Sequence, residues 1–361
     1  MKIFTLLIAL LVSFVAAAQH ARVRPLADTI GFAHTALQMD SFVSRMERLQ
    51  GAMLREKTGN LASHKEKDWK LVISPHDDYT YTGYLYSLGL SALHAKTVIV
   101  FGVAHKARQF ASKNKIVFDS YDFWCGPFGD IPVSALRDDI MNTLPANTFE
   151  LNDSLQRAEH SVEAVLPFLQ YYRHDVEIVS ILVPYMSFSR MDSISRHLSE
   201  AIALALKKRN LHWGKDVALV ISNDAVHYGD EGWNGKNFGK FGTDSAGYKK
   251  ALEYEQHIIG ECLTGKLHDD KVKSFNTYTV KQDDFNEYLW TWCGRFSVPF
   301  GLLTAYYMQL RLSSKPLRGY LFDYNTSISN SHIRVDDLGM GITAPATMRH
   351  WVGYTVIGYC E

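Results

Sequence analysis

Residues 217–224 read VALVISND, an apolar strand-like run that ends in an acid, and His227 follows three residues later. Two similar runs lie upstream, residues 70–76 (KLVISPH) and residues 97–105 (TVIVFGVAH), and each of them ends in a histidine. In an open α/β sheet, ligands bind in the crevice outside the carboxyl ends of the strands. If the three runs are neighbouring parallel strands, their polar ends meet in one pocket. The sequence therefore predicts an enzyme-like, metal-binding site at that edge of the sheet.

Strand-like and helix-like segments alternate along the chain, which favours a single α/β domain. Residues 177–183 (EIVSILV) form a near-continuous apolar run, as expected of a strand that is buried on both faces. No internal repeat and no Pro/Ser-rich linker divides the chain, and residues 229–247 are the longest loop candidate. We expect a sandwich in which a central, mostly parallel mixed sheet is flanked by helices. Helices are expected at residues 38–56, 84–93, 134–143, 161–172, 189–208, 248–263 and 298–312, and further strands at 116–118, 130–133, 319–324 and 351–359.

The N-terminus has the form of a secretory signal peptide. Lys2 is the positive charge, residues 3–15 are apolar, and residues 16–18 are the small residues of a cleavage site. The apolar segment is short for a membrane span, although an uncleaved N-terminal anchor is the alternative. We expect residues 1–18 to be removed, and residues 19–361 to form the mature domain. The protein would then be exported, to a periplasm or out of the cell, and would not contact the membrane after cleavage.

The charge balance argues against a nucleic-acid partner. The chain has 38 basic and 38 acidic residues, so its formal net charge is zero. Proteins that bind nucleic acids normally carry a basic excess or a basic stripe, and this sequence has neither. We expect a small-molecule or peptide ligand instead.

The four cysteines leave the redox state open. An exported protein meets oxidising conditions, so disulfides can form. Four cysteines allow three complete pairings, and the sequence does not choose among them. No CxxC pair occurs, which disfavours a zinc ribbon or a thioredoxin-like motif. The cysteines are Cys125, Cys262, Cys293 and Cys360.

Two histidines end successive strand-like runs. His76 is followed by Asp77 and Asp78, whose carboxylates could orient its imidazole as metal-bound histidines usually require. The alternative is a surface turn in which Asp78 caps the next helix. His105 by itself could be a structural histidine, but a second histidine on a neighbouring strand favours metal ligation, since neutral imidazole is the commonest metal ligand.

The motif EHSVE at residues 159–163 opens a predicted helix. Capping and the favourable position of an acid in the first turn account for Glu163. A histidine at a helix N-terminus is driven toward its neutral form, so His160 suits a hydrogen-bond donor or a proton shuttle. Cys293, taken alone, would be an inert buried thiol or half of a disulfide.

Asp224 and His227 are three residues apart, so a turn would place them on one side. They could form an acid/base pair, or Asp224 could complete a two-histidine, one-carboxylate metal site with His76 and His105. The alternative is a helix-capping aspartate followed by an exposed histidine. Eight further histidines are expected to be surface residues: His94, His174, His197, His212, His257, His268, His332 and His350.

Five motifs, taken in order, resemble those of the Memo family, also called the AmmeMemoRadiSam system protein B family. PHDDYTYTG at residues 75–83 is similar to the family's PHAGYxYSG, GVAH at 102–105 is similar to GxxH, and EHSxE at 159–163 is intact. DAVHYG at 224–229 is similar to DxSHYG, and the CG pair at 293–294 precedes a Pro-containing helix, as in the family. Each motif alone is weak, but the ordered set is specific.

The resemblance implies a fold like that of the class III, LigB-type extradiol dioxygenases. Those enzymes hold non-haem iron with two histidines and a carboxylate, whereas the matching pocket of Memo-like proteins has two histidines and a cysteine. Carried over position by position, the metal ligands would be His76, His105 and Cys293. The metal would be iron or copper, with zinc possible, because a thiolate makes a soft site.

The resemblance also implies catalytic candidates. Asp224 and His227 would line the pocket, and His160 would stand near the acid/base position of the dioxygenases. The expected function is that of an exported metalloprotein with a redox-metal pocket, acting as an oxidoreductase or dioxygenase-like enzyme. The alternatives are a non-catalytic module that binds a peptide or small ligand, and a zinc-dependent hydrolase with Asp224 as base. The chain departs from the family in having Asp77-Asp78 for Ala-Gly and Val226 for Ser.

Overall fold

The computed structural model describes residues 21–60, 68–313, 315–329 and 331–361. The segment predicted to be a signal peptide lies outside these residues. The helices are α1 Ala36–Asn60, α2 Tyr79–Leu90, α3 Leu136–Thr143, α4 Asp153–Ala158, α5 Leu166–Tyr172, α6 Phe188–Arg209, α7 Ser245–Ile258, α8 Asp269–Thr279 and α9 Ser297–Leu312. The strands are β1 Val23–Arg24, β2 Leu71–Ser74, β3 Thr97–Val103, β4 Ile116–Phe118, β5 Phe123–Trp124, β6 Ile131–Pro132, β7 Phe149–Leu151, β8 Glu177–Val183, β9 Val217–Ser222, β10 His227–Gly229, β11 Gly265–Lys266, β12 Arg318–Thr326 and β13 His350–Cys360.

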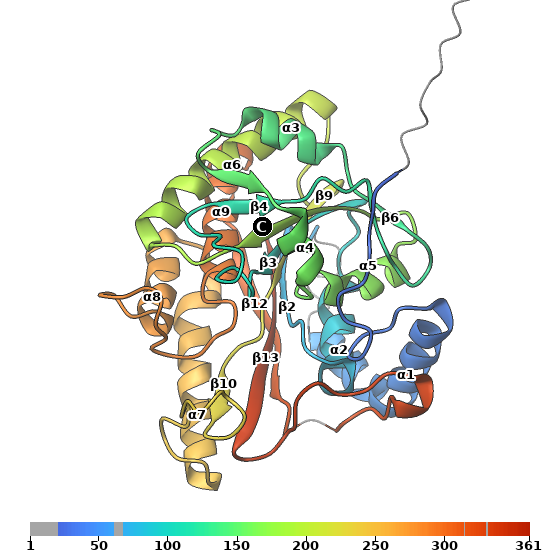
Figure 1. Cartoon of the computed structure of the whole chain (residues 1–361), viewed down its shortest axis with the longest axis vertical. Helices are drawn as coiled ribbons and strands as arrows, with labels where there is room; N and C mark the ends of the chain where they lie inside the picture. Colours follow the sequence, from blue (N-terminus) through green and yellow to red (C-terminus); the bar gives the residue numbers. More distant parts are fainter. Residues whose placement is uncertain (1–20, 61–67, 314, 330) are drawn as a thin grey trace, which may run out of the picture.

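A ten-stranded mixed sheet runs through the middle of the described chain (Figure 1). Its order is β11-β12-β13-β2-β9-β3-β8-β4-β7, and β10 pairs with β13. The four central strands β2, β9, β3 and β8 are parallel to one another. β13 runs antiparallel to its neighbour β2, and β12 runs antiparallel to β13. The expected α/β fold with a mixed sheet is confirmed.

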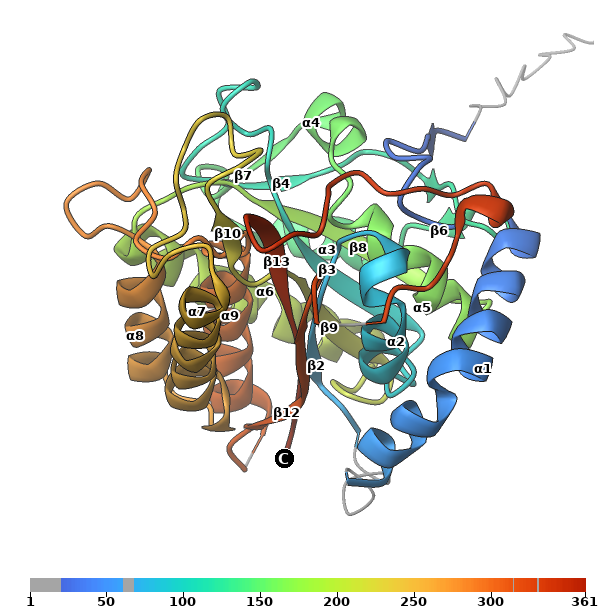
Figure 2. The same cartoon turned by 90° about the horizontal axis from the view of Figure 1, so that it is seen from below.

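The central strands are apolar throughout because helices cover both faces of the sheet. Side chains alternate between the faces of a strand, so Leu71 and Ile73 enter one hydrophobic core while Val72 enters the other. Seen along the sheet, α6, α7, α8 and α9 lie on one side and α1, α2 and α5 on the other (Figure 2). Among the helices of the described residues, none has both the length and the apolar character needed to cross a bilayer.

The three runs expected to be neighbouring parallel strands are neighbours. β9, which comes late in the chain, lies between β2 and β3 and pairs with both. The carboxyl ends of all three strands therefore meet at one edge of the sheet, which is where a site in such a sheet forms.

The segment after the EHSVE motif is less helical than expected. Residues 163–165 form one 3₁₀ turn, and α5 begins only at Leu166, with Pro167 in its first turn. Proline suits that position because the backbone N–H it lacks would have no partner in the helix. His160 therefore lies in irregular chain three residues before this 3₁₀ turn, not at the helix N-terminus that the sequence predicted.

An N-terminal arm lies beside the main sheet and is held by a buried ion pair. β1 pairs with β5 in a small separate sheet. Arg24 of β1 forms an ion pair with Glu163, and both side chains are almost fully buried. The Glu163 carboxylate also accepts hydrogen bonds from the backbone N–H groups of Ala27, at 2.8 Å, and Asp28, at 2.9 Å. The interpretation of Glu163 as a simple helix cap is therefore wrong, because its carboxylate anchors the arm.

Candidate metal centre

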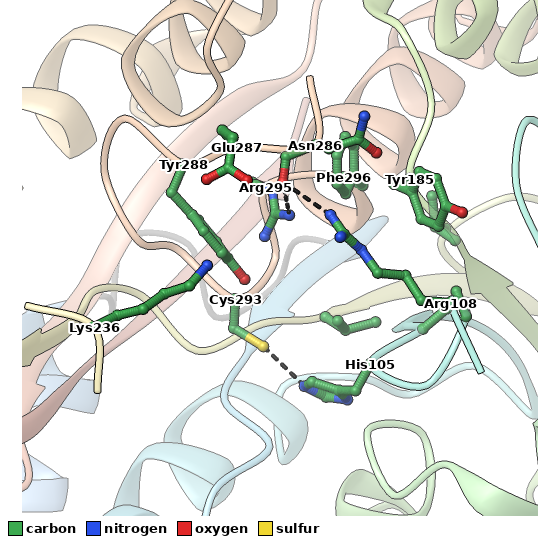
Figure 3. Close-up of a pocket in the computed structure, with 14 residues that line it drawn as sticks. His105, Arg108, Tyr185, Lys236, Asn286, Glu287, Tyr288, Cys293, Arg295 and Phe296 are labelled. Atoms are coloured by element: carbon green, nitrogen blue, oxygen red, sulfur yellow. Dashed lines mark hydrogen bonds between the residues drawn. The ribbon is translucent and has the colours of Figure 1, made fainter. Parts of the chain in front are cut away.

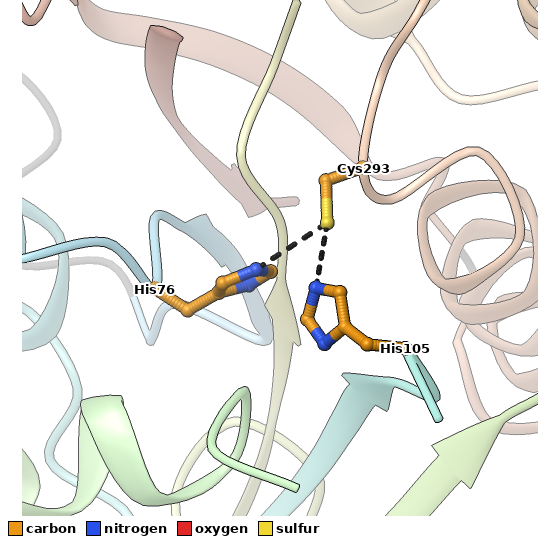
Figure 4. A group of neighbouring side chains, drawn as sticks. All are labelled: His76, His105 and Cys293. Carbon is orange, nitrogen blue, oxygen red and sulfur yellow. Dashed lines mark hydrogen bonds between the residues drawn. The ribbon is translucent and has the colours of Figure 1, made fainter. Parts of the chain in front are cut away.

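Three predicted ligand residues converge at the carboxyl edge of the sheet. His76 follows β2, His105 follows β3, and Cys293 precedes α9, and one donor atom from each lies within 4.8 Å of the others (Figure 4). The Cys293 Sγ lies 2.9 Å from His105 Nε2 and 3.5 Å from His76 Nε2. His76 and Cys293 are buried, whereas the His105 side chain is 29% exposed, so the group opens toward solvent on one side.

The end of β9 fixes the position of Cys293. The Cys293 backbone N–H donates to the carbonyl oxygen of Asp224 at 3.2 Å, and the Gly294 N–H donates to Asn223 Oδ1 at 3.0 Å. A Cβ at Gly294 would lie 2.1 Å from that same Asn223 oxygen. Glycine therefore follows Cys293 because a side chain at residue 294 would clash with Asn223 and push the cysteine away from the two histidines.

A buried carboxylate orients His105. Glu159 Oε2 lies 3.0 Å from His105 Nδ1, and its other oxygen accepts from the backbone N–H of Lys106. Burial lowers the pKa of His105, but the charges of Cys293 and Glu159 outweigh burial and raise this pKa well above its ordinary value. Metal-bound histidines usually have such an outer partner, which leaves the other ring nitrogen for the metal. The sequence interpretation gave Glu159 no role.

A hydroxyl relay sets the tautomer of His76. Ser222 donates its hydroxyl hydrogen to the carbonyl oxygen of Ser161, so its oxygen accepts from His76 Nδ1 at 2.8 Å. His76 Nε2 then carries the lone pair that points toward Cys293. Burial, together with the neighbouring His105, lowers the pKa of His76 well below its ordinary value, which keeps this ring neutral.

Asp224 lies next to His76. Its Oδ1 accepts from the His76 backbone N–H at 2.9 Å, and its Oδ2 lies 3.3 Å from His76 Nε2. Burial, with the nearby charge of Asp77, raises the pKa of Asp224 well above its ordinary value. The carboxyl group is therefore biased toward its protonated form, which can donate as well as accept a hydrogen bond.

His160 stacks on His105. The two ring centroids are 4.8 Å apart and the ring planes differ by 11°, while the His76 ring lies 5.7 Å away, edge to face. Burial and His105 lower the pKa of His160 to about 4. The ring of Phe32, from the N-terminal arm, also stacks on the His160 ring, with centroids 6.3 Å apart.

His227 borders the group from β10. It lines a hollow together with His105, Cys293 and Trp233, and burial lowers its pKa to about 3. Its Nε2 is buried and has no hydrogen-bond partner among the described residues. The structure thus brings all six predicted site residues to one edge of the sheet, and their roles as ligands or acid/base groups stay predictions.

A family model describing Memo-like proteins matches residues 40–337. This range covers most of the chain and every predicted site residue. The chain belongs to the Memo family. It is 27% identical over 162 residues to a MEMO1 family protein of Pyrococcus abyssi, which is 44% of this chain and 52% of that protein. It is 28% identical over 180 residues to a MEMO1 family protein of Archaeoglobus fulgidus, 49% of this chain and 61% of that protein. The chain thus spans about half the length of the curated relatives it matches.

The two acids that replace the Memo family's Ala-Gly do not orient His76. Asp77 accepts a hydrogen bond from Tyr354 OH at 2.6 Å, and Asp78 accepts from the backbone N–H of Thr343 at 2.6 Å. Asp78 precedes α2 but makes no capping hydrogen bond with its side chain. The expectation that these acids orient His76 is wrong, because their partners come from the C-terminal part of the chain. Asp78 does stand at the N-cap position of α2, as the alternative expected, but it is buried and only its backbone carbonyl accepts from the first turn of the helix. Burial and the charge of Asp77 raise the pKa of Asp78 to about 7.

One histidine of this Memo family member was wrongly expected to be a surface residue. His350 is 5% exposed, and its ring stacks on that of Trp233 with centroids 3.9 Å apart. Trp233 lies in the irregular segment between β10 and α7, within the long loop predicted from the sequence. The His350–Trp233 stack therefore ties this loop to β13 beside the candidate site.

A buried glutamate supports the segment that carries the Memo cysteine. Glu255, on α7, is fully buried and accepts hydrogen bonds from the indole N–H groups of Trp290 and Trp292. It also accepts from Tyr324 OH at 3.1 Å and from the Val226 backbone N–H at 3.3 Å. One carboxylate thus joins β12, the chain just before Cys293 and the chain just after β9.

Glu255 predicts a pH dependence of stability. Burial raises its pKa from the ordinary 4.5 to about 7, so the folded protein holds a proton that the unfolded chain releases. The free energy of unfolding is therefore expected to fall as the pH rises between these two values. Glu255→Gln does not titrate, so the stability advantage of the wild type over this variant should be greater at about pH 5 than at about pH 8. Urea denaturation of both proteins measures this difference, and a pH-independent difference would contradict the raised pKa.

Proposed function

We propose that this Memo family member binds one redox-active transition metal, iron or copper, through His76, His105 and Cys293. The observation that carries the proposal is the convergence of one sulfur and two imidazole nitrogens within 4.8 Å. A thiolate with two imidazoles suits copper(I), iron or zinc far better than magnesium or calcium. The tautomer set by Ser222 and the carboxylate of Glu159 further support this fit, because each leaves a histidine Nε2 turned toward the sulfur.

When bound, the metal would supply one-electron redox chemistry to an oxidoreductase or dioxygenase-like reaction. The surrounding residues would handle protons. His160 has a pKa of about 4, so it is neutral at physiological pH and can accept a hydrogen bond beside the pocket. Asp224, biased toward its protonated form, can donate a hydrogen bond near His76. His227, with its unpartnered Nε2, can accept one from a bound molecule.

The ligand that we propose is a small molecule or a short peptide segment. A second hollow, lined by His105, Cys293 and Arg295 but not by His227, has a volume of about 240 Å³, which is below the usual range of about 300–1,000 Å³ for ligand pockets.

We further propose that the protein is exported and that its N-terminus is cleaved before Gln19. N-terminal sequencing of the protein from its native host tests the cleavage directly.

Metal content and oxygen uptake test the proposed function together. Protein purified without an affinity tag is expected to carry about one iron or copper ion per chain, and to consume oxygen with at least one member of a panel of phenolic substrates. Stoichiometric zinc with activity on esters or amides would instead indicate a hydrolase. No metal at any stage, combined with ligand-induced stabilisation, would instead indicate a binding module.

A further inference from the structure

The hollow next to the candidate metal centre has a strongly basic wall. Arg108, Lys236 and Arg295 line it together with His105 and Cys293 (Figure 3). Lys236 and Arg108 approach from opposite sides in this view, and Arg295 is drawn above Cys293. Tyr185, Tyr288 and Phe296 supply aromatic surface, and Glu287 is the acidic residue of the lining.

Arg295 differs from the other buried arginines. In the described residues three arginines are less than one tenth exposed: Arg24 at 1%, Arg137 at 9% and Arg295 at 8%. Arg24 forms an ion pair with Glu163, and Arg137 forms one with Asp119. Arg295 has no carboxylate within ion-pair distance in the described chain, and its buried Nε has no hydrogen-bond partner there. Burying a charge is costly unless it is paired. A bound anion would provide the counter-charge that Arg295 lacks in the described chain.

A second guanidinium increases this unbalanced charge. Arg108 and Arg295 both donate to the backbone carbonyl oxygen of Asn286, at 3.1 Å and 3.5 Å (Figure 3). Two like charges thus converge on one neutral oxygen. Lys236 is exposed, and Glu287, although it lines the same hollow, forms no ion pair with any of these bases in the described chain.

We propose that Arg295, with Arg108 and Lys236, binds the anionic group of the substrate beside the metal pocket. A guanidinium matches a carboxylate or a phosphate, because both offer paired oxygen acceptors. The Arg295 guanidinium lies 3.5 Å over the Tyr288 ring, which fixes its plane. The aromatic walls would take up an apolar body, so the substrate class is a small carboxylate or phosphate ester with an apolar portion.

Calorimetric titration with benzoate and with inorganic phosphate tests this subsite. The wild-type protein is expected to bind at least one of them, more weakly as salt concentration rises, and the anion that binds identifies the substrate group. Arg295→Gln should weaken binding by at least about tenfold, and Arg295→Lys should recover part of it. Arg108→Gln is expected to weaken binding as well, and it keeps the test valid if Arg295→Gln fails to fold. Wild-type protein that binds neither anion, or an Arg295→Gln variant that binds like the wild type, would overturn the proposal.

Arg318→Gln is the matched control, because Arg318 is an exposed arginine at the opposite edge of the sheet. It pairs with Cys360 in β13, next to the start of β2, whereas the hollow lies beyond the strands' carboxyl ends. Anion binding by this variant should equal that of the wild type.

The anion subsite rests on the proposed function only in that the site beside it is taken to bind a metal. The anion subsite and the metal site can therefore fail separately. Titrations are therefore repeated with Cys293→Ser, with metal quantified in every sample. Anion binding that depends on Arg295 and persists in metal-free Cys293→Ser supports the subsite whether or not the wild type holds metal. Anion binding that disappears with the metal, while Arg295→Gln has no effect, would assign the anion to the metal and overturn the subsite.

Discussion

Replacing Cys293 by serine is expected to weaken metal binding by more than about 100-fold. Loss of a residue that merely supports a ligand already costs about 10- to 100-fold in affinity, and Cys293 would be the sulfur ligand itself. A serine hydroxyl is a harder donor and stays protonated at neutral pH, so it replaces the thiolate poorly for iron, copper or zinc. The backbone hydrogen bond from residue 293 to Asp224 does not involve the sulfur, so the variant is expected to fold.

Competition against a chelator of known affinity measures this loss. Cys125→Ser is the matched control, because Cys125 follows β5 in the small sheet and is not part of the converging group. Its metal affinity should equal that of the wild type. If Cys293→Ser binds metal as tightly as the wild type, the Cys293 sulfur is not a metal ligand.

Replacing Glu163 by alanine is expected to lower the free energy of unfolding by about 3–5 kcal/mol. Removing one partner of a buried ion pair leaves the other charge uncompensated, and Arg24 is 1% exposed. The substitution also removes the acceptor for the N–H groups of Ala27 and Asp28. The arm should then detach and uncover His160, which Phe32 flanks in the wild type.

Urea denaturation followed by tryptophan fluorescence measures the loss, and limited proteolysis after Arg22 or Arg24 reports the detached arm. Asp336→Ala is the matched control because it breaks an ion pair with Arg334 whose side chains are 66% and 73% exposed. An exposed pair contributes little, so the control should unfold like the wild type. A Glu163→Ala variant as stable as the control would show that the buried pair does not hold the arm.

The sequence predicted the sheet and the edge where the site lies because these depend on local patterns. Apolar runs such as residues 217–222 must be buried on both faces, and the first polar residue after each run marks the end of the strand. Asp224 and His76 follow two such runs, and they meet because the structure pairs β2 with β9 in parallel, which the sequence interpretation had only assumed. The family motifs added Cys293, which no local pattern distinguishes from an inert buried thiol.

Interactions between distant segments were not predictable from single residues. Asp77 and Asp78 follow His76 in the chain, but their partners are Tyr354 and Thr343, more than 260 residues away. Nothing beside Glu163 in the sequence points to Arg24, from which it is separated by 139 residues.

Two further residues were missed although a signal was present. Glu159 is the first residue of the intact EHSVE motif, and its position beside His160 would have justified a supporting role for it. Arg295 follows the CG pair directly, so a basic residue next to a predicted ligand was visible. Its lack of a carboxylate partner, however, appears only when the chain is folded.

X-ray absorption at the metal edge of the zinc-loaded protein tests the central claim most directly, because zinc is a redox-silent probe of the same donors. The account predicts one sulfur neighbour at about 2.3 Å and nitrogen neighbours at about 2.0–2.1 Å, with the sulfur signal lost in Cys293→Ser. A spectrum of the wild-type protein that contains nitrogen and oxygen neighbours but no sulfur would contradict it.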